Sequence, residues 1–301
     1  MSLHVIVGAG PVGTSVARLL AADGEQVRII TRRGAGPTHP LVERVAADAS
    51  DADRLRELTA GAVALYNCAN PPYDQWPTAW PPLSRAMIGA AQATGAVLAI
   101  TGNLYGYGPV HGPMTEDLPL AATGRKGRVR AKMWHDALAA GVPTFEVRAS
   151  DYIGPGAASV ITNYLLPAAA ARRTLRIPAD IDLPHSFTYT GDVARALVTM
   201  ARDERAWGRP WHVPSNPPLT IRELTRRFFE VTGQAPVKVV GMPRWLPRAA
   251  GLFSSMVREF NEMDYQFYAP FELDTSAATR TFGLRPTPLD DALRAAVPVP
   301  A

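Results

Sequence analysis

Cysteine is almost absent from this sequence of 301 residues, in which Cys68 is the single thiol. One cysteine excludes an intramolecular disulfide and any metal site built from several cysteines. Glycine, proline or charge interrupts each apolar run before the roughly 18 residues that a transmembrane helix needs. The first residues also lack the basic segment that precedes the apolar run of a signal peptide. We therefore expect a cytoplasmic protein with no membrane partner.

Two motifs of hydrolytic enzymes are also missing. The six histidines show no H-E-x-x-H or similar spacing, so no metal is expected. No G-x-S-x-G segment occurs, so nothing indicates a serine hydrolase.

The net charge is +4, but the densest basic run, at 125–132, contains no aromatic residue. Such a run is more typical of a solvated surface or an anion site than of a nucleic-acid groove, so we expect no nucleic-acid partner.

The first 150 residues contain a regular alternation of short apolar runs and amphipathic segments. Strands are expected at 5–7, 27–30, 45–46, 63–66, 97–100 and 145–148. Helices are expected between them, at 12–22, 51–59, 81–94 and 127–140. This alternation predicts an α/β fold of the Rossmann type, in which a doubly wound parallel sheet carries helices on both faces.

A glycine-rich segment, Gly8-Ala9-Gly10-Pro11-Val12-Gly13, connects the first expected strand to the first expected helix. Gly8 permits a tight turn, Gly10 lets a pyrophosphate approach the backbone, and Gly13 lets helix and strand pack closely. Free N–H groups at the helix start then favour an anion. The pattern predicts a dinucleotide cofactor; the alternative is a glycine-rich turn without a ligand.

The second expected strand ends in Thr31-Arg32-Arg33. Arg32 lies about 20 positions after Gly13, near where an NAD-binding protein places an acid for the ribose 2′-hydroxyl. No acid is present here, and two guanidinium groups can bind a 2′-phosphate. We therefore predict NADP as the cofactor, with NAD as the less favoured choice. The alternative is a pair of solvated arginines in a loop.

The pattern loosens after about residue 157, and this change suggests a division of the chain. Further helices are expected at 158–172, 192–201, 221–232 and 246–264, with a loop at 178–184. We assign residues 1–157 and about 184–208 to a dinucleotide-binding Rossmann domain. A smaller substrate-binding region would comprise about 158–183 and 209–301.

Several further segments resemble one known family in order and spacing. These segments are Asp48-Ala49-Ser50-Asp51, Asn67-Cys68-Ala69-Asn70, Thr101-Gly102-Asn103-Leu104-Tyr105-Gly106, Arg148 to Gly156, Ser186 to Val193, and Arg280 to Pro286. Together they resemble the extended short-chain dehydrogenase/reductase family, in its NAD-dependent epimerase/dehydratase branch. The resemblance implies cofactor contacts from Pro11, Val12, Asp48, Ala49, Ala69 and Ser150. It also implies a possible homodimer through the helices near 81–94 and 127–140.

The same resemblance exposes a departure at the expected catalytic pair. The family uses a Tyr and a Lys four residues apart on one helix, so that both face the nicotinamide. Lys132 fits the Lys position, where it would hold the cofactor ribose, but the position four residues earlier holds Arg128. A guanidinium cannot serve as proton donor, because it does not deprotonate in proteins. A general acid contributes about 10²–10⁴-fold to rate, so its replacement matters.

Other hydroxyl groups are candidates for the missing role. Thr101 matches the family's hydroxyl that bonds a substrate carbonyl. Tyr105, Tyr107 and Tyr152 follow strands at the sheet edge where this fold binds ligands, although each could instead be a packing aromatic. We take Thr101, Lys132 and Tyr105 as candidate catalytic residues.

Three functions are compatible with these features. We favour an NADP-dependent oxidoreductase or epimerase that transfers hydride on a small ketone or alcohol, such as a secondary metabolite. The expected pocket walls are Trp76, Trp80, Trp134, Tyr265, Phe267 and Tyr268. The missing Tyr keeps a non-catalytic NADP-binding sensor or regulator open, and a nonredox isomerase on the same scaffold is the third option.

Overall fold

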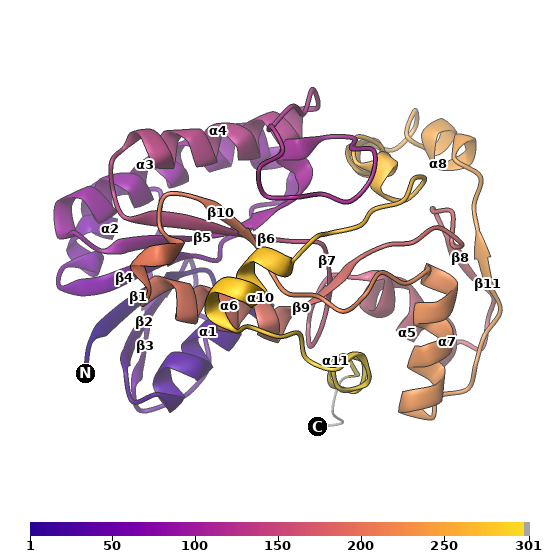
Figure 1. Ribbon diagram of the computed structural model, residues 1–301, viewed down its shortest axis with the longest axis horizontal. Coiled ribbons are helices and arrows are strands. Elements are labelled where there is room, and N and C mark those ends of the chain that lie inside the picture. The colour runs from indigo at the N-terminus through magenta and orange to yellow at the C-terminus, as the bar shows by residue number, and fades with distance from the viewer. Residues whose placement is uncertain (298–301) are drawn as a thin grey trace.

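Within residues 1–297, which a computed structural model describes, seven parallel strands form the central sheet (Figure 1). Their order across the sheet is β10-β6-β5-β4-β1-β2-β3. The strands are β1 (Leu3–Val7), β2 (Gln26–Thr31), β3 (Val42–Ala46), β4 (Ala62–Asn67), β5 (Val97–Asn103), β6 (Thr144–Ala149) and β10 (Pro210–His212). The expected Rossmann-type α/β fold is therefore confirmed.

Helices cover both faces of this sheet, as Figure 1 shows. One layer consists of α1 (Pro11–Ala22) and α6 (Thr190–Ala201), and the other of α2 (Ala52–Thr59), α3 (Trp76–Thr94) and α4 (Arg125–Ala139). Val16 of α1 and Leu197 of α6 share one apolar core, while Met87 of α3 and Trp134 of α4 belong to the second. Burial of the two cores fixes both helix layers on the sheet.

The strand order creates a crevice at one point of the sheet. From β1 the chain runs outward to β2 and β3, and it then returns to the other side of β1 to form β4. The connections that leave β1 and β4 therefore diverge at the carboxyl edge. Ligands of doubly wound folds bind at such a switch point.

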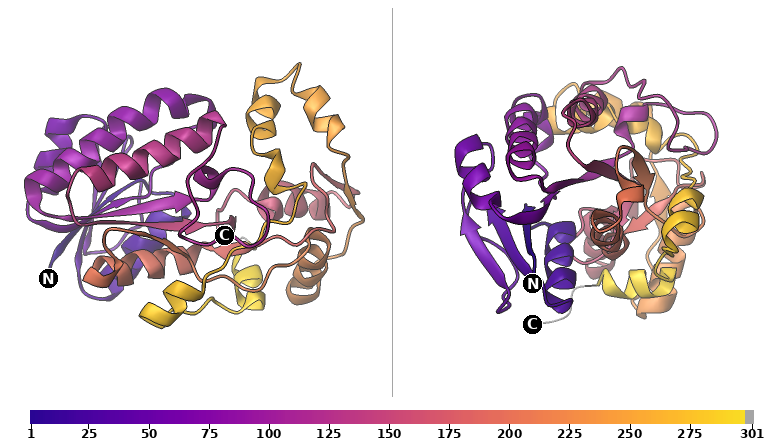
Figure 2. Two further views of the ribbon diagram at one scale, coloured as in Figure 1. Left: turned by 45° about the horizontal axis from the view of Figure 1, so that its top comes forward. Right: turned by 60° about the vertical axis from the view of Figure 1, so that its left-hand side comes forward.

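The rest of the chain packs beside the carboxyl edge of the central sheet (Figure 2). Two small parallel pairs lie here: β7 (Asp151–Ile153) with β9 (Phe187–Tyr189), and β8 (Leu175–Ile177) with β11 (Val239–Gly241). The helices of this part are α5 (Leu166–Ala170), α7 (Ile221–Thr232), α8 (Trp245–Ala250), α9 (Ser255–Asn261) and α11 (Leu289–Ala295). Helix α10 (Ser276–Phe282) packs instead on β10, and its Ala278 belongs to the same core as Val16 and Leu197. Leu165, Leu224 and Leu293 contribute to a separate apolar core.

Several element boundaries differ from the sequence-based predictions. Helix α3 begins at Trp76 rather than 81, because Trp76 and Trp80, one turn apart, are both buried against the sheet despite the prolines that follow. The helix expected at 246–264 is divided into α8, α9 and a 3₁₀ turn, η5 (Asp264–Gln266); the break falls at Gly251, which packs closely against Asn261.

Two further differences concern the second half of the chain. The helix expected at 158–172 consists of a π-helical turn, η3 (Ile161–Leu165), followed by α5. Strand β10 lies beyond the expected boundary near 208 and yet pairs with β6 in the central sheet. Residues 298–301, the last of the expected substrate-binding region, lie outside the described part. In the described part, no helix combines the length and the apolar character needed to cross a membrane.

Candidate active site

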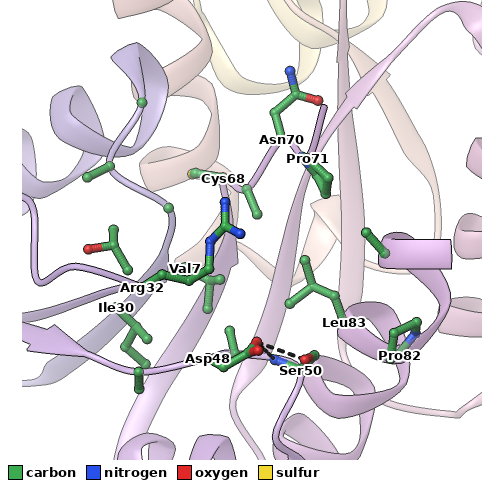
Figure 3. A pocket seen from close by; sticks show the side chains of 18 of the residues that line it. Val7, Ile30, Arg32, Asp48, Ser50, Cys68, Asn70, Pro71, Pro82 and Leu83 are labelled. Carbon is green, nitrogen blue, oxygen red and sulfur yellow. Dashed lines mark hydrogen bonds between the residues drawn. The ribbon is translucent and has the colours of Figure 1, made fainter. Parts of the chain in front are cut away.

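A cavity of about 430 Å³ lies at the switch point between β1 and β4. Its walls come from the turn after β1, the ends of β2 and β3, the segment after β4, and one face of α3 (Figure 3). The lining includes the expected cofactor residues Gly8, Gly10, Arg32, Asp48, Ala49 and Ala69. The structure thus brings residues from four separate loops to one cavity.

The three glycines of the turn are required for three different reasons. Gly8 has a φ of +104°, and a Cβ there would meet the carbonyl oxygen of Cys68 at 2.6 Å. A Cβ on Gly13 would overlap the carbonyl oxygen of Gly8. A Cβ on Gly10, in contrast, would meet no atom of the described chain within 4 Å, because it would point into open space. This space beside the start of α1, whose first turn carries no acid, fits a pyrophosphate.

The two arginines after β2 are placed differently. Arg32 lines the cavity, with Asp48 and Ser50 below it and Asn70 and Pro71 above it in Figure 3. Arg33 is exposed and lies outside that lining. The N–H and the hydroxyl of Ser50 donate to Asp48 at 2.9 and 2.8 Å, and these bonds hold the pKa of Asp48 below its usual value. Asp48 is therefore a fixed acceptor in the same cavity as the Arg32 cation.

A second cavity, of about 290 Å³, continues from the first past Gly10, Cys68, Ala69 and Asn70. Its lining contains many of the remaining expected residues: Pro11, Val12, Thr101, Tyr105, Ser150 and Tyr152. It also contains Tyr73, Arg130, Asp151, Gln266 and Phe271, none of which we had selected as site residues. The two cavities form one continuous groove along the carboxyl edge of the sheet.

Three hydroxyl groups of the second cavity have partners within the described chain. Tyr105 and Tyr73 lie 2.8 Å apart through their hydroxyl oxygens, and Thr101 donates to the sulfur of Cys68 at 3.6 Å. Burial raises the pKa of Tyr105 well above its ordinary value, and it also raises the pKa values of Tyr73 and Tyr152. These phenols therefore stay neutral across the physiological pH range.

Tyr107, the third tyrosine considered as a proton donor, does not line this cavity. Its hydroxyl accepts a hydrogen bond of 2.7 Å from Arg148 and lies 2.8 Å from Nε2 of His212. All three residues are buried. Tyr107 thus belongs to a structural network beside the groove.

Helix α4 presents a different residue to the cavity than expected. Lys132 is directed outward: its side chain is 72% exposed and donates to Asp136 at 2.7 Å. Arg128 is exposed as well and donates to the carbonyl of Thr123. Arg130 faces the cavity instead, because residues two apart on a helix point in roughly opposite directions. The expected position of Lys132 beside the nicotinamide ribose is therefore inconsistent with this structure.

The side chain of Arg130 is held rigidly at the cavity wall. It is 7% exposed, and its guanidinium lies over the rings of Trp76 and Trp80, 5.6 and 5.0 Å from their centroids. Nη2 donates to the carbonyl oxygen of Thr101 at 2.7 Å, whereas Nε and Nη1 have no acceptor among the described residues. The hydroxyl of Ser150 and the amide nitrogen of Gln266, in the same lining, are likewise unpaired within that part of the chain.

One turn before Arg130, the buried Lys126 joins α4 to α9. Its ammonium is 1% exposed and donates to the carboxylate of Glu259, and to that of Glu262 at 3.1 Å. Its backbone N–H donates to Glu262 at 2.6 Å. The pair four residues apart on the inner face of α4 is thus Lys126 and Arg130, in place of a Tyr and a Lys.

Of the aromatic residues expected to form the pocket walls, one lines the second cavity. Trp76 lies there, whereas Trp80 and Trp134 are buried in the apolar core and Tyr265 lines a smaller neighbouring cavity. The others are engaged elsewhere: Phe267 stacks on His185, and Tyr268 donates to the carbonyl of Met242. Among residues 1–297, no group of three or more His, Cys, Asp or Glu side chains could hold a metal ion.

Comparison with known proteins assigns the chain to a family. Residues 4–213 match the model of the NAD dependent epimerase/dehydratase family. This match spans more than half of the chain, so the protein belongs to that family, whose members are enzymes of the NAD-dependent epimerase and dehydratase type. A search of curated protein sequences found no match.

Solved structures agree with this assignment at the level of the fold. The Bordetella bronchiseptica enzyme WbmH, solved with NAD+, superposes with a TM-score of 0.76 at 19% identity, covering 98% of this chain and 97% of that one. The dTDP-glucose 4,6-dehydratase from Bacillus anthracis, solved with NAD, gives 0.78 at 14% identity, covering 98% and 95%. An epimerase from Methanothermobacter thermautotrophicus gives 0.80 at 18%, covering 98% and 90%.

Proposed function

We propose that this chain is an NADP-dependent oxidoreductase or epimerase that acts by hydride transfer on a small ketone or alcohol, including those of secondary metabolism. One observation carries the proposal: the groove runs from the cavity that holds Arg32 and Asp48, past the phosphate-binding turn, to a cluster of polar groups at its other end. A dinucleotide of extended shape matches such a groove, and its reactive end would lie among those polar groups.

Specific residues would hold the cofactor along this groove. Gly10, Pro11 and Val12 offer the start of α1 to the pyrophosphate, and Asp48 and Ala49 flank the adenine end. Ala69 lies at the middle of the groove, with Ser150 and Arg130 at the far end. When bound, the nicotinamide supplies the hydride donor and acceptor. Arg130, in place of Lys132, would hold the ribose, because its buried Nε and Nη1 have no acceptor among the described residues.

Arg32 supports the preference for NADP over NAD. It lies at the end of β2, where its guanidinium can donate to a 2′-phosphate. Arg33 plays no part in this preference, since it lies outside the lining. The solved structures named above contain NAD, which is therefore the second candidate. The ratio of the two dissociation constants decides between them.

The second cavity supports a small substrate. Its volume of about 290 Å³ must hold the nicotinamide as well, and its walls include the aromatic rings of Tyr73, Trp76 and Phe271. A nucleotide sugar is the competing substrate class, since a solved structure of similar fold is a dTDP-glucose dehydratase. Thr101 and Tyr105 are available to bond a substrate oxygen.

Fluorescence titration of the purified protein with NADPH and NADH tests the cofactor. We expect tighter binding of NADPH, and equal affinities would refute the role of Arg32.

Turnover is tested with panels of ketones, alcohols and UDP- or dTDP-sugars, with Arg130→Ala as the inactive control and Lys132→Ala as the active one. Tight cofactor binding without turnover on any panel would instead support a sensor. The proposed homodimer through α3 and α4 is tested by light scattering.

A further inference from the structure

Asp151, which lines the second cavity, forms a close pair with His185, which lies behind it. Oδ2 of Asp151, at the start of β7, lies 2.6 Å from Nε2 of His185, which precedes β9. The other ring nitrogen, Nδ1, lies 3.2 Å from the backbone carbonyl oxygen of Gln266. The ring is buried and stacks between Phe267 and Phe271, with centroids 5.5 and 5.1 Å away. Both nitrogens of the imidazole are thus held against defined partners.

The hydrogen-bond chemistry fixes the number of protons in this pair. A carbonyl oxygen can only accept, so Nδ1 carries a hydrogen and donates it to Gln266. A neutral ring would then place the lone pair of Nε2 against an oxygen of Asp151. At 2.6 Å two lone pairs repel, so one further proton must lie between Nε2 and Oδ2. That proton belongs to the pair, whether it is closer to nitrogen or to oxygen.

Only the carboxyl end of the pair reaches the cavity. The side chain of Asp151 is 29% exposed and lines the cavity, whereas that of His185 is 4% exposed. Within the segment Arg148 to Gly156, Asp151 takes the position at which the resembling family has Asn. An Asn amide could not exchange a proton. The carboxyl therefore replaces a permanent amide with a group that can gain or lose a proton.

We propose that Asp151, positioned by His185, is the acid–base group of the second cavity. On oxidation of an alcohol, Oδ1 of Asp151 would take the proton as the hydroxyl O–H bond breaks, and a bound oxidised dinucleotide would supply the acceptor for the C–H hydrogen with its electron pair. Reduction runs in reverse, with Oδ1 donating to the alkoxide oxygen. This proposal rests on the proposed function, because it assumes an oxygen-bearing substrate in the groove.

The tyrosines of the same cavity are weaker candidates for this role. Burial is the main cause that raises the pKa values of Tyr105, Tyr152 and Tyr73, and the nearby charge of Asp151 adds to it. The ammonium of Lys126 lies 5.6 Å from the centroid of the Tyr73 ring, but it is bonded to Glu259 and Glu262 rather than to a phenol oxygen. The phenols can still orient a substrate oxygen by hydrogen bonds.

Nitrogen-15 NMR of the histidine rings tests the shared proton without cofactor or substrate. We expect a proton on or near Nε2 of His185, or on the carboxyl of Asp151 by carbon-13 NMR, and its loss in Asp151→Asn. His212 is the internal reference, because its Nδ1 donates to the carbonyl of Asp274 and its Nε2 accepts from Tyr107. If His185 shows the same bare Nε2 as His212 while Asp151 is ionised, the proposal is overturned.

Turnover separates this inference from the proposed function. We expect Asp151→Asn to lower kcat by about 10²–10⁴-fold with little change in cofactor affinity. Asp136→Asn, which alters an acid on the outer face of α4, is the matched control and should be unaffected. Wild-type turnover that survives in Asp151→Asn would refute the acid–base role even if the shared proton is observed. A wild-type protein without turnover would refute the proposed function, while the NMR result would still decide the pair.

Discussion

Nη2 of Arg130 donates to the carbonyl oxygen of Thr101, and this bond joins the inner face of α4 to the end of β5. The remaining donors of the guanidinium are buried and unpaired within the described chain. Replacing buried ionic groups with apolar side chains of similar volume is often neutral or stabilising. We expect Arg130→Met to raise the free energy of unfolding by about 1 kcal/mol without ligand. The same variant should lower dinucleotide affinity at least about tenfold.

Thermal unfolding and cofactor titration of the same preparation check both halves of this expectation. Arg130→Lys is a second variant for the same measurements, because it keeps the positive charge but loses the planar guanidinium and its fixed N–H donors. An Arg130→Met protein that is destabilised and binds normally would mean that the guanidinium is a structural group.

Lys126 and Lys132 offer a second contrast on the same helix. Lys126→Met leaves two partly buried carboxylates without their cation, so we expect a loss of about 1–3 kcal/mol in the free energy of unfolding. Lys132→Met removes an exposed ion pair with Asp136 and should change the free energy of unfolding by less than about 0.5 kcal/mol. Denaturant unfolding measures both. Equal losses would contradict the orientation of α4 described above.

Gly10 and Gly13 separate ligand binding from stability. Gly10→Ala places its methyl group in open space, so we expect unchanged thermal stability but a dinucleotide affinity at least about tenfold lower. Gly13→Ala forces a methyl group onto the carbonyl of Gly8 and should cost about 1–3 kcal/mol of stability. Calorimetric titration and thermal unfolding give the two readouts, and normal affinity in Gly10→Ala would argue against a pyrophosphate at this turn.

Arg32 and Arg33 form a matched pair for cofactor preference. We expect Arg32→Ala to raise the dissociation constant of NADPH by about 10–100-fold and to leave that of NADH within about twofold. Arg33→Ala should leave both within about threefold, because this side chain lies outside the cavity. Parallel fluorescence titrations decide this, and identical effects on the two cofactors would remove the basis for an NADP preference.

His212 predicts a specific acid sensitivity. Burial lowers its pKa to about 4 from 6.5. In the unfolded chain, His212 therefore binds a proton below pH 6.5. In the folded chain, the same ring stays neutral until the pH falls to about 4. Stability from this residue is fully present above pH 6.5 and falls by about 3 kcal/mol as the pH drops to 4. In His212→Gln the unfolding free energy should decline less over that range; an unchanged slope would contradict the neutral buried ring.

The fold and the phosphate-binding turn were predictable from local patterns. Short apolar strands alternate with amphipathic helices, and Gly8, Gly10 and Gly13 act through their own backbone, so neighbouring residues suffice to predict them. The sequence places Arg32 and Arg33 at the end of β2, but it does not tell which of the two side chains lines the cavity. Neighbouring residues at the end of a strand point in different directions, and only Arg32 is in the lining.

Helix α4 shows why the catalytic residues were harder to predict. Its first half is dominated by charged residues, so no apolar stripe marks the buried face. Arg130 and Lys132 lie roughly 200° apart around the helix, and the choice of the wrong basic residue moved the expected site to the outer surface. The pairs Asp151–His185 and Tyr73–Tyr105 join residues more than 30 positions apart, so they depend on tertiary packing.

Strand β10 has a consequence for how the chain must fold. Along the chain, β7 and β9, which lie outside the central sheet, precede α6 and β10, and β10 pairs with β6. A fragment that ends near residue 157 would keep α1 but lack α6, which shares an apolar core with Phe145 and Val147, and it would leave the β6 edge open to pairing with other chains. The second cavity, whose lining includes Gln266 and Phe271, is complete only in a chain that has been synthesised well past Ser150.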